Sequence, residues 1–575
     1  FIPGSEVFAD ESIYSCLNIA DNLLLLTRTR GLYSFDGRTF SPFESEAGDF
    51  IKKHRPIHSI ILNDNLAAIA TTDAGIIFIN ASGDIIHHVD KKEGLRDNTV
   101  WYLSKDRDGG LWCALNNGIS RVEFPSALTL FDDRHGLDGV AQDIIRHNGS
   151  LYVAASPYGV FQLQSHSDGS STSAKFSQIS GISTQTWHFA SVQNRLLVAA
   201  NNGIYEIKNQ DATPILTGAK LEAAFLKVSR YDSTRVFAGL FDGLAILKLS
   251  NKRWTLEQRF TFNDEIRSII EEEQGLLWLG TRSSGVHRIR LSEKSSFQIE
   301  ENKHYTEESG LPAGQTFVFL VDDAPIFTTE DRGVFLFDEE SQKFSPSSKF
   351  GHRFSDGSCD VELVVQSRDG QRVWLGAAET GTMTEMTKSK NGDYSRVNNA
   401  LARLPRSAVR AVYEDNDGII WISTNDALCR YDEQASLWSN SLFSAHVRRV
   451  ILNSDSLLYG GAARPSTELM PQLPHNNNAF RIEYAAASFD AMQLNSYQTY
   501  LEGFDKKWSQ WTRDTWKEFT NLSPGVYKFR VRAKNVHDAM SKEVSYSFQL
   551  LPPWYRTIAA YIGYAILLGG LIFAV

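Results

Sequence analysis

The chain is poor in the residues that mark metal sites, disulfide frameworks and nucleic-acid surfaces. Its 575 residues include five methionines and four cysteines. There is no CxxC pair and no metal-ligand spacing among the cysteines, which are Cys16, Cys113, Cys359 and Cys429. The formal net charge is −10, whereas a nucleic-acid surface needs a concentrated basic face. We therefore expect no metal, no cofactor and no nucleic-acid partner for this segment, and we interpret the cysteines in apolar stretches as buried small side chains.

Catalytic motifs are lacking as well. The sequence contains no GxSxG, no HExxH, no P-loop and no GxGxxG between a strand and a helix. His87 and His88 are adjacent, but neighbouring residues on a strand point to opposite faces, so the two cannot share a ligand site. We therefore predict no catalytic residue and no enzyme activity in this segment.

What the sequence does contain is a repeated hairpin. In the stretch 98–124, apolar runs are separated by tight polar turns, which predicts short antiparallel strands. Related stretches recur at intervals of 40 to 48 residues, marked by the turn residues Gly31, Gly75, Gly118, Gly159, Gly203, Gly243, Gly285, Gly333, Gly381 and Ala427. A period in this range with several short strands per copy is typical of β-propeller blades.

Four tryptophans occupy one register of the middle strand: Trp112, Trp278, Trp374 and Trp421. A large apolar side chain repeated at one position inside a blade is best explained by packing between neighbouring blades. We therefore predict that these residues are structural and do not bind a ligand.

The repeat ends after Asp432, and longer alternating strands follow. Alternation predicts one buried and one wet face, and about 110 residues of such strands suit a small β-sandwich. At the end of the chain, residues 558–575 run for 18 residues without a charge. Because about 20 helical residues span a bilayer core, we predict a transmembrane helix that the end of the chain truncates, with Trp554 and Tyr555 at the interface.

Two stretches resemble known families. EGLRDNTVWYLSKDRDGGLWCALNNGISRV resembles the two-component-regulator propeller repeat, and YQTYLEGFDKKWSQW followed by FTNLSPGVYKFRVRAKN resembles the triple-tyrosine (Y_Y_Y) domain. Tyr500, Trp508 and Tyr527 match the second pattern, whereas Phe519 stands where a tyrosine often occurs and should still fill the core. The resemblance implies two consecutive seven-bladed rings outside a membrane. We thus expect an all-β chain: the last blades of a first propeller (1–125), a second complete propeller (126–440), an Ig-like sandwich (441–552) and the truncated helix (558–575).

Propeller geometry points to a candidate binding site. The strand before each tryptophan strand should be innermost, so the loop that leads into it and the loop with the turn glycine should open on the same end of the channel. In the complete ring the residues that enter there are Gln142, Trp187, His188, Arg267, Gln315 and Arg410, and in the first ring Asn98 and Trp101. Planar apolar faces beside hydrogen-bonding groups suit a small polar ligand such as an oligosaccharide. The alternative is that these side chains simply fill the channel.

The resemblance implies a function. It identifies the chain as the ligand-sensing region, periplasmic or extracellular, of a bacterial membrane receptor. Such a receptor is a homodimer through its β-sandwich and passes the signal to a cytoplasmic output. That output is most often a histidine kinase of a hybrid two-component phosphorelay, and in other cases a cyclase-type enzyme. Two alternatives stay open: a propeller lyase or hydrolase, which would need converging histidine and acidic residues, and a membrane-anchored interaction scaffold.

Overall fold

The computed structural model describes residues 2, 4–20, 22–164, 174–218, 221–292, 297–329, 332–377, 383–397, 400–435, 443–453, 455–461 and 470–574. The chain divides into two compact units. One comprises Phe1–Ser395 and Pro405–Trp438, and the other Arg396–Leu404 and Ser439–Val575. Strands dominate both units, which confirms the prediction of an all-β fold.

Three antiparallel sheets come first, which we call the N-terminal sheets. Their strands are β1 (Ile13–Ile19), β2 (Asn22–Thr27), β3 (Leu32–Phe35) and β4 (Phe40–Pro42), then β5 (Pro56–Asn63), β6 (Leu66–Thr71), β7 (Ile76–Ile79) and β8 (Ile85–Val89), then β9 (Val100–Lys105), β10 (Leu111–Leu115) and β11 (Gly118–Val122). The first strands of the three sheets contact one another in order. Between the first two sheets lies α1 (Glu46–Lys53), which the sequence reading did not anticipate. Its N-terminus is capped by Ser45, and it buries Ala47 and Ile51.

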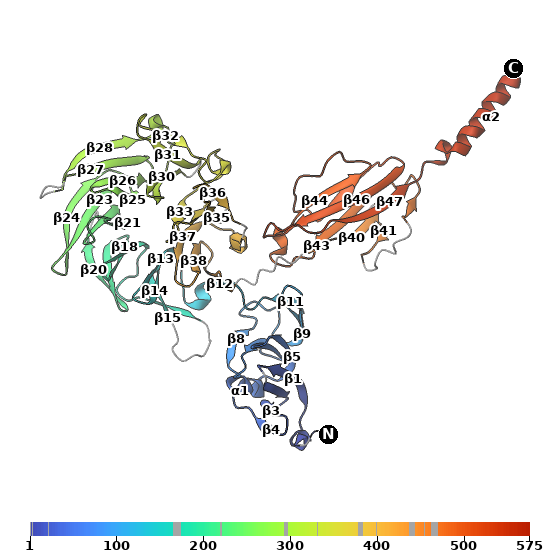
Figure 1. Cartoon of the computed structure of the whole chain (residues 1–575), viewed down its shortest axis with the longest axis horizontal. Coiled ribbons are helices and arrows are strands. Elements are labelled where there is room, and N and C mark those ends of the chain that lie inside the picture. The colour runs from blue at the N-terminus through green and yellow to red at the C-terminus, as the bar shows by residue number, and fades with distance from the viewer. Residues whose placement is uncertain are drawn as a thin grey trace. The chain divides into compact units, whose positions relative to one another are not determined.

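Seven four-stranded sheets follow, which we call the ring (Figure 1). The innermost strand of each sheet contacts that of the next, and β13 contacts β37, so these contacts close into a circle, as in a β-propeller. The strands are β12 (Leu128–Phe131), β13 (Val140–His147), β14 (Ser150–Ser156), β15 (Gly159–Gln164), β16 (Lys175–Gln178), β17 (Thr186–Val192), β18 (Arg195–Ala200), β19 (Gly203–Lys208), β20 (Asp211–Thr217), β21 (Ala223–Val228), β22 (Arg235–Leu240), β23 (Gly243–Ser250), β24 (Arg253–Thr261), β25 (Ile266–Glu273), β26 (Leu276–Thr281), β27 (Val286–Leu291), β28 (Ile299–Tyr305), β29 (Thr316–Val321), β30 (Ala324–Thr329), β31 (Gly333–Asp338), β32 (Lys343–Pro346), β33 (Leu363–Gln366), β34 (Arg372–Gly376), β35 (Met383–Lys388), β36 (Tyr394–Arg396), β37 (Val409–Glu414), β38 (Ile419–Thr424) and β39 (Leu428–Asp432).

The last sheet of the ring is built from both ends of the repeat. Strand β12 pairs antiparallel with β39, so that Leu128 lies opposite Tyr431. Across the same join, the Arg146 guanidinium donates to the buried Asp415 carboxylate, with Nε 2.7 Å from Oδ1. The ring is therefore held together where its first and last sheets meet by a strand pair and an ion pair.

Three of the four repeated tryptophans are packing residues, as predicted, whereas Trp112 is only half-buried. Trp278 and Trp374 have no exposed surface, and Trp421 is 2% exposed. The Trp278 ring packs edge-on against Phe327 of the next sheet, with ring centroids 4.9 Å apart. In three copies the indole N–H also donates to the acidic residue six positions earlier: Trp112 to Asp106, Trp278 to Glu272 and Trp421 to Asp415. In these three copies the acidic residue before the tryptophan strand thus orients the indole.

The second unit contains a sandwich of two four-stranded sheets. Its strands are β40 (Ala445–Leu452), β41 (Ser456–Tyr459), β42 (Gln472–Leu473), β43 (Phe480–Ala486), β44 (Ser496–Glu502), β45 (Trp516–Phe519), β46 (Gly525–Lys534) and β47 (Val544–Leu550). Phe519 is buried against Phe529, as expected for an aromatic ring at that position. Tyr527 is buried and donates its hydroxyl to the Ser523 carbonyl at 2.7 Å.

The apolar stretch near the end of the chain forms helix α2 (Ile558–Ala574), which has 17 residues. No helix in the described part of the chain is both long enough and apolar enough to cross a membrane. The helix predicted at 558–575 is present and runs to Ala574, and its crossing of a membrane stays a prediction.

The cysteines agree with their interpretation. Cys113, Cys359 and Cys429 are buried and free, and Cys16 is free and exposed. Burial raises the pKa of the Cys113 thiol, and likewise that of Cys429, to about 12. Both thiols are therefore protonated and unreactive at neutral pH.

Candidate ligand-binding site

The predicted site residues share a backbone feature. The innermost strand of most sheets in the ring carries a β-bulge just after its start, and a bulge turns a side chain away from the regular pleat. The residues left unpaired there are Gln142, Trp187, His188, Ala224, Arg267 and Arg410. Five of the six predicted residues therefore occupy bulges. The sixth, Gln315, immediately precedes β29 and is half-buried.

Backbone hydrogen bonds define the end of the ring where these bulges lie. In four sheets of the ring, the residue after the second strand donates its N–H to the carbonyl of the residue just before the innermost strand. Asn201 donates to the Gln185 carbonyl at 3.0 Å, and Arg282 donates to the Glu265 carbonyl at the same distance. The two kinds of loop therefore lie together in these sheets, as the sequence predicted. We call this end of the ring the mouth.

Two of the predicted residues meet at the mouth. The Arg267 guanidinium, from the sheet β25–β28, lies over the Trp187 ring of the sheet β17–β20, 5.8 Å from its centroid. The Trp187 indole N–H donates to Asn201 Oδ1 at 2.7 Å, and Asn201 in turn donates to Gln185 at 2.9 Å. Phe241, from the intervening sheet, stands edge-on to Trp187 at 6.3 Å. One aromatic face and one cation are thus brought together by three consecutive sheets.

Glu265 holds the arginine of this pair in place. Its carboxylate is 6% exposed and lies 2.9 Å from Arg267 Nε. Arg282 Nη1 approaches the other oxygen of the same carboxylate at 3.2 Å. The Arg282 side chain is 63% exposed, so its remaining donors face solvent. The Trp187–Arg267 pair is therefore positioned from both sides before any ligand arrives.

The other predicted residues lie apart from this pair. Arg410 donates to Asn425 at 2.8 Å and lies 3.7 Å from Glu362, in the last two sheets of the ring. Gln142 and Gln315 are half-buried. Within the described residues, no hydrogen bond or ion pair joins these three side chains to Trp187 or Arg267. The structure therefore gathers two of the six predicted residues into one cluster and distributes the rest around the mouth.

His188 turns toward the wall of the channel. Its Nε2 lies 3.8 Å from the Asp143 carboxylate, and its ring contacts Phe225 with centroids 4.0 Å apart. Asp143 accepts a hydrogen bond from the backbone N–H of Phe189 at 2.7 Å, which links two neighbouring sheets. Burial lowers the pKa of His188, and Asp143 acts in the opposite direction. Burial raises the pKa of Asp143. The packing of His188 on Phe225 and its approach to Asp143 join neighbouring sheets. This arrangement agrees with the alternative interpretation, in which the predicted residues fill the channel.

Several residues of the cluster were missed by sequence reasoning. They are Gln185, Asn201, Phe241, Glu265 and Arg282. Each lies directly before an innermost strand or directly after a middle strand. Aligning the ten copies on their turn residues would have placed all of them at the mouth, because these two positions are hydrogen-bonded to each other in each of these sheets.

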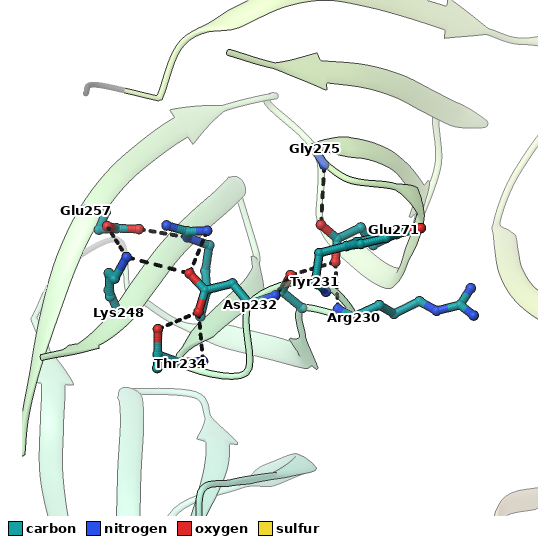
Figure 2. Close-up of polar contacts among 10 residues, drawn as sticks. Arg230, Tyr231, Asp232, Thr234, Lys248, Glu257, Glu271 and Gly275 are labelled. Carbon is teal, nitrogen blue, oxygen red and sulfur yellow. Dashed lines mark hydrogen bonds and ion pairs between the residues drawn. The ribbon is translucent and has the colours of Figure 1, made fainter. Parts of the chain in front are cut away.

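The opposite end of the same sheets has a different character. Figure 2 shows Glu271, whose carboxylate accepts from the backbone N–H of Arg230 at 2.7 Å and from that of Gly275 at 3.3 Å. Nearby, Lys248 lies between Asp232 and Glu257, at 3.5 and 3.9 Å. Carboxylates that are bound by backbone donors or lysine stabilise loops. We therefore place the candidate site at the mouth and not at this end.

The described ring also has an open pocket of about 510 Å³ beside the sheet β29–β32. None of the six predicted residues lines it. Its lining comprises Glu307, Gly310, Leu311, Pro312, Arg332, Phe335, Pro346, Ser355, Asp356 and Gly357. This surface offers no aromatic face paired with a fixed cation, which distinguishes it from the Trp187–Arg267 cluster.

Two segments of the chain match known protein families. Residues 403–426 match the two component regulator propeller model, and residues 488–550 match the Y_Y_Y domain model. The resemblances predicted from the sequence are thereby confirmed. No curated protein sequence matches the chain.

Solved structures share the fold. A crystal structure described as the extracellular domain of a hybrid two component system, BT3049 from B. thetaiotaomicron, has 17% sequence identity and a TM-score of 0.72, and the match covers 94% of this chain and 73% of that one. A second extracellular domain from B. thetaiotaomicron, BT4673, is 12% identical over 95% of this chain and 97% of that one, but its TM-score of 0.31 is too low to support an argument. The chain thus carries a two component regulator propeller repeat and a Y_Y_Y domain, and its fold resembles that of an extracellular domain of a two-component system.

Proposed function

We propose that this chain is the sensory extracellular region of a bacterial signalling receptor and that it recognises a polar oligosaccharide at the mouth of the ring. The observation that supports the proposal is the preorganised pair of Trp187 and Arg267, which face each other at 5.8 Å. The Y_Y_Y and propeller matches support a sensory role.

The chemistry of the cluster suits a sugar. A pyranose ring has an apolar face of C–H groups and a rim of hydroxyls, so it needs an aromatic surface with donors and acceptors around it. Trp187 and Phe241 supply aromatic surface, whereas Arg282 supplies exposed donors. Because Asn201 and Glu265 already fix the indole and the Arg267 guanidinium, a ligand would lose little free energy to ordering these side chains.

In this proposal the ring is a complete seven-bladed propeller, the N-terminal sheets are the last blades of another, and the sandwich relays the signal in a homodimer. A ligand can shift such a receptor only by its difference in affinity between two arrangements of the sandwich domains. The output would be a membrane-linked signalling enzyme, with a histidine kinase of a hybrid phosphorelay as the first candidate and a cyclase as the second.

A binding experiment tests the site. Cellohexaose, xylohexaose, mannohexaose and hexagalacturonate are titrated separately into the purified chain by isothermal calorimetry. For a hexasaccharide that binds, Trp187→Ala should weaken the affinity of this site at least tenfold, and Arg267→Ala should also weaken it. The matched control is Trp516→Ala. Trp516 forms a similar pair with Arg481, at 4.6 Å, but lies in the sandwich, so this variant should bind as the wild type does.

Two results would contradict the proposal. If no hexasaccharide binds, the ligand class is wrong. If one binds equally well to the wild type and to Trp187→Ala, the site is wrong. Chromatography of the same mixtures addresses the enzyme alternative, because release of shorter sugars that requires His188 would indicate a glycan lyase or hydrolase. Sedimentation velocity with and without the bound hexasaccharide tests whether binding alters the association of the chain, which a simple anchored scaffold would not require.

A further inference from the structure

One end of the sandwich is defined by the strand that leads to helix α2. Strand β47 ends at Leu550, which pairs with Gly525 at the start of β46. Lys528 of β46 pairs with Glu502 at the end of β44, so these strand ends lie together. Only a short segment separates Leu550 from Ile558, the first residue of α2. The residues around these strand ends therefore form the surface at which the chain leaves the sandwich.

This surface, which we call the exit surface, combines apolar and basic side chains. It consists of six exposed residues, three apolar and three basic: Phe504, Val526 and Leu551, and Lys506, Lys507 and Lys528. Phe504 is 55% exposed although its ring meets that of Phe519 at 5.9 Å, and Val526 is 57% exposed. Trp554, in the segment that leads to α2, is 76% exposed. Apolar side chains interleaved with lysines suit contact with the headgroup layer of a membrane.

The lysines of the exit surface are not neutralised by their neighbours. The Glu502 carboxylate binds Arg530 at 2.9 Å. The Asp505 carboxylate accepts a hydrogen bond from the backbone N–H of Leu501 at 2.8 Å. Among the residues that the structure describes, none of the three lysines forms a hydrogen bond or an ion pair. The exit surface therefore carries a net positive charge, although the formal net charge of the whole chain is −10.

A second copy of the chain is a poor partner for this surface. In a two-fold pair the same surface meets itself, so the three lysines would face three lysines and repel them. Anionic phospholipid headgroups carry the complementary charge. The exposed rings of Phe504 and Trp554 also suit the headgroup region, where aromatic side chains are enriched. Charge and apolar character therefore favour the same partner, an anionic lipid surface.

We propose that the exit surface binds an anionic phospholipid membrane, with Lys506, Lys507 and Lys528 at the headgroups and Phe504 and Val526 at the boundary of the apolar layer. This inference rests on the part of the proposed function that links the chain to a membrane through α2. Binding would hold the sandwich in one arrangement on the membrane. Because a ligand shifts a receptor only by its difference in affinity between two arrangements, the charge of the lipid would set how much of that difference a signal requires.

A fluorescent label tests this contact in the full chain reconstituted into nanodiscs. Cys16, the exposed cysteine, is replaced by serine, and the dye NBD is attached to Val526→Cys. The matched control carries the dye at Met540→Cys. Met540 is also apolar and is 42% exposed, but it pairs with Lys534 at the other end of β46, about 27 Å along the strand from position 526. With a doxyl-labelled lipid in nanodiscs of equimolar phosphatidylglycerol and phosphatidylcholine, the dye at 526 should be quenched and the dye at 540 should not.

Charge variants test which groups make the contact. Lys506→Gln and Lys507→Gln should each lower the ratio of bound to released sandwich roughly fivefold. Nanodiscs of phosphatidylcholine alone, and high salt, should reduce the quenching at 526 in the same direction. Lys534→Gln and Lys542→Gln remove the same charge at the opposite end of the sandwich, so they should leave the quenching unchanged.

Several results would overturn this inference. Equal quenching at 526 and 540 excludes binding by the exit surface, and quenching at 526 that ignores lipid charge and both lysine substitutions excludes anionic lipid as the partner. A blue shift of the dye at 526 without quenching indicates a protein partner, such as a second copy, and also contradicts the proposal. A chain that does not enter nanodiscs overturns both this inference and the membrane link of the proposed function. Calorimetry with the hexasaccharides needs no nanodiscs, so the sugar site stands or fails independently.

Discussion

Replacing Trp278 by alanine should destabilise the ring strongly. The side chain has no exposed surface and packs against Phe327 and Phe337, at 4.9 and 5.1 Å. Truncating a fully buried tryptophan typically costs about 3–5 kcal/mol through lost transfer free energy and the cavity that remains. The lost hydrogen bond to Glu272 adds little, because Arg288 still binds that carboxylate at 3.1 Å. We therefore expect the free energy of unfolding to fall by about 4 kcal/mol.

Trp112 provides the matched control for this substitution. Its indole donates to Asp106 at 3.0 Å, and Arg121 binds the same carboxylate at 2.9 Å, so the polar contacts are those of Trp278. Trp112, however, is only half-buried. Trp112→Ala should therefore cost about 1–2 kcal/mol. Urea denaturation followed by circular dichroism, compared at equal m-values, measures both losses. Equal losses in the two variants, or a loss below about 1 kcal/mol for Trp278→Ala, would refute packing between sheets as the role of this register.

Three further predictions concern the ring. Asp415→Asn should cost about 3 kcal/mol at pH 7, because it leaves the Arg146 charge without its partner. Burial is the largest single influence and acts to raise the pKa of Asp415, but the hydrogen bonds from Arg146, from the Asn416 backbone and from Trp421 together with the Arg146 charge hold this pKa below its ordinary value. The difference from the wild type should therefore shrink as the pH falls below about 4, and a constant difference in urea melts would contradict this. Burial raises the pKa of Glu385, so the charged carboxylate destabilises the folded state at pH 7. Glu385→Gln should therefore raise the free energy of unfolding by about 1 kcal/mol at pH 7. Calorimetry should find a smaller gain at pH 4, because the wild-type carboxyl is then largely protonated. Gly285 has a φ of 79°, and a Cβ there would lie 2.3 Å from the Tyr305 carbonyl oxygen. Gly285→Ala should therefore lower the free energy of unfolding by about 2 kcal/mol or more. An unchanged melting temperature would show that the backbone of this turn relaxes to accept the Cβ.

Local patterns predicted most of the fold. The spacing of the turn residues located the hairpins because glycine is favoured where the backbone turns with positive φ, and Gly75, Gly118 and Gly333 all adopt such values. The register of Trp278 predicted burial because one position of a repeated strand meets the same neighbour in every copy. The alternation in β46 predicted a sandwich strand for the same reason, since its residues are alternately buried and accessible.

Contacts between distant segments could not be predicted in this way. Strand β12 has four residues and no turn signal, so its pairing with β39 is fixed only when the ring closes. The bulge before Ser268 aims Arg267 toward Trp187, yet a bulge is an irregularity of pairing that leaves no trace in apolar periodicity. His188 was expected at the mouth together with its neighbour, but it packs on Phe225 instead.

The pairing of β12 with β39 has a consequence for synthesis of the protein. Leu128 lies opposite Tyr431, about 300 residues further along the chain. At about 5–20 residues per second, a ribosome needs roughly 15–60 s to make the intervening segment. During that time β12 has no partner from its own sheet, and the outer edge of the ring cannot be completed. An open strand in a nascent chain pairs readily with other strands. The short length of β12, four residues that include Thr129, limits this risk, because a short edge strand offers few backbone groups for pairing.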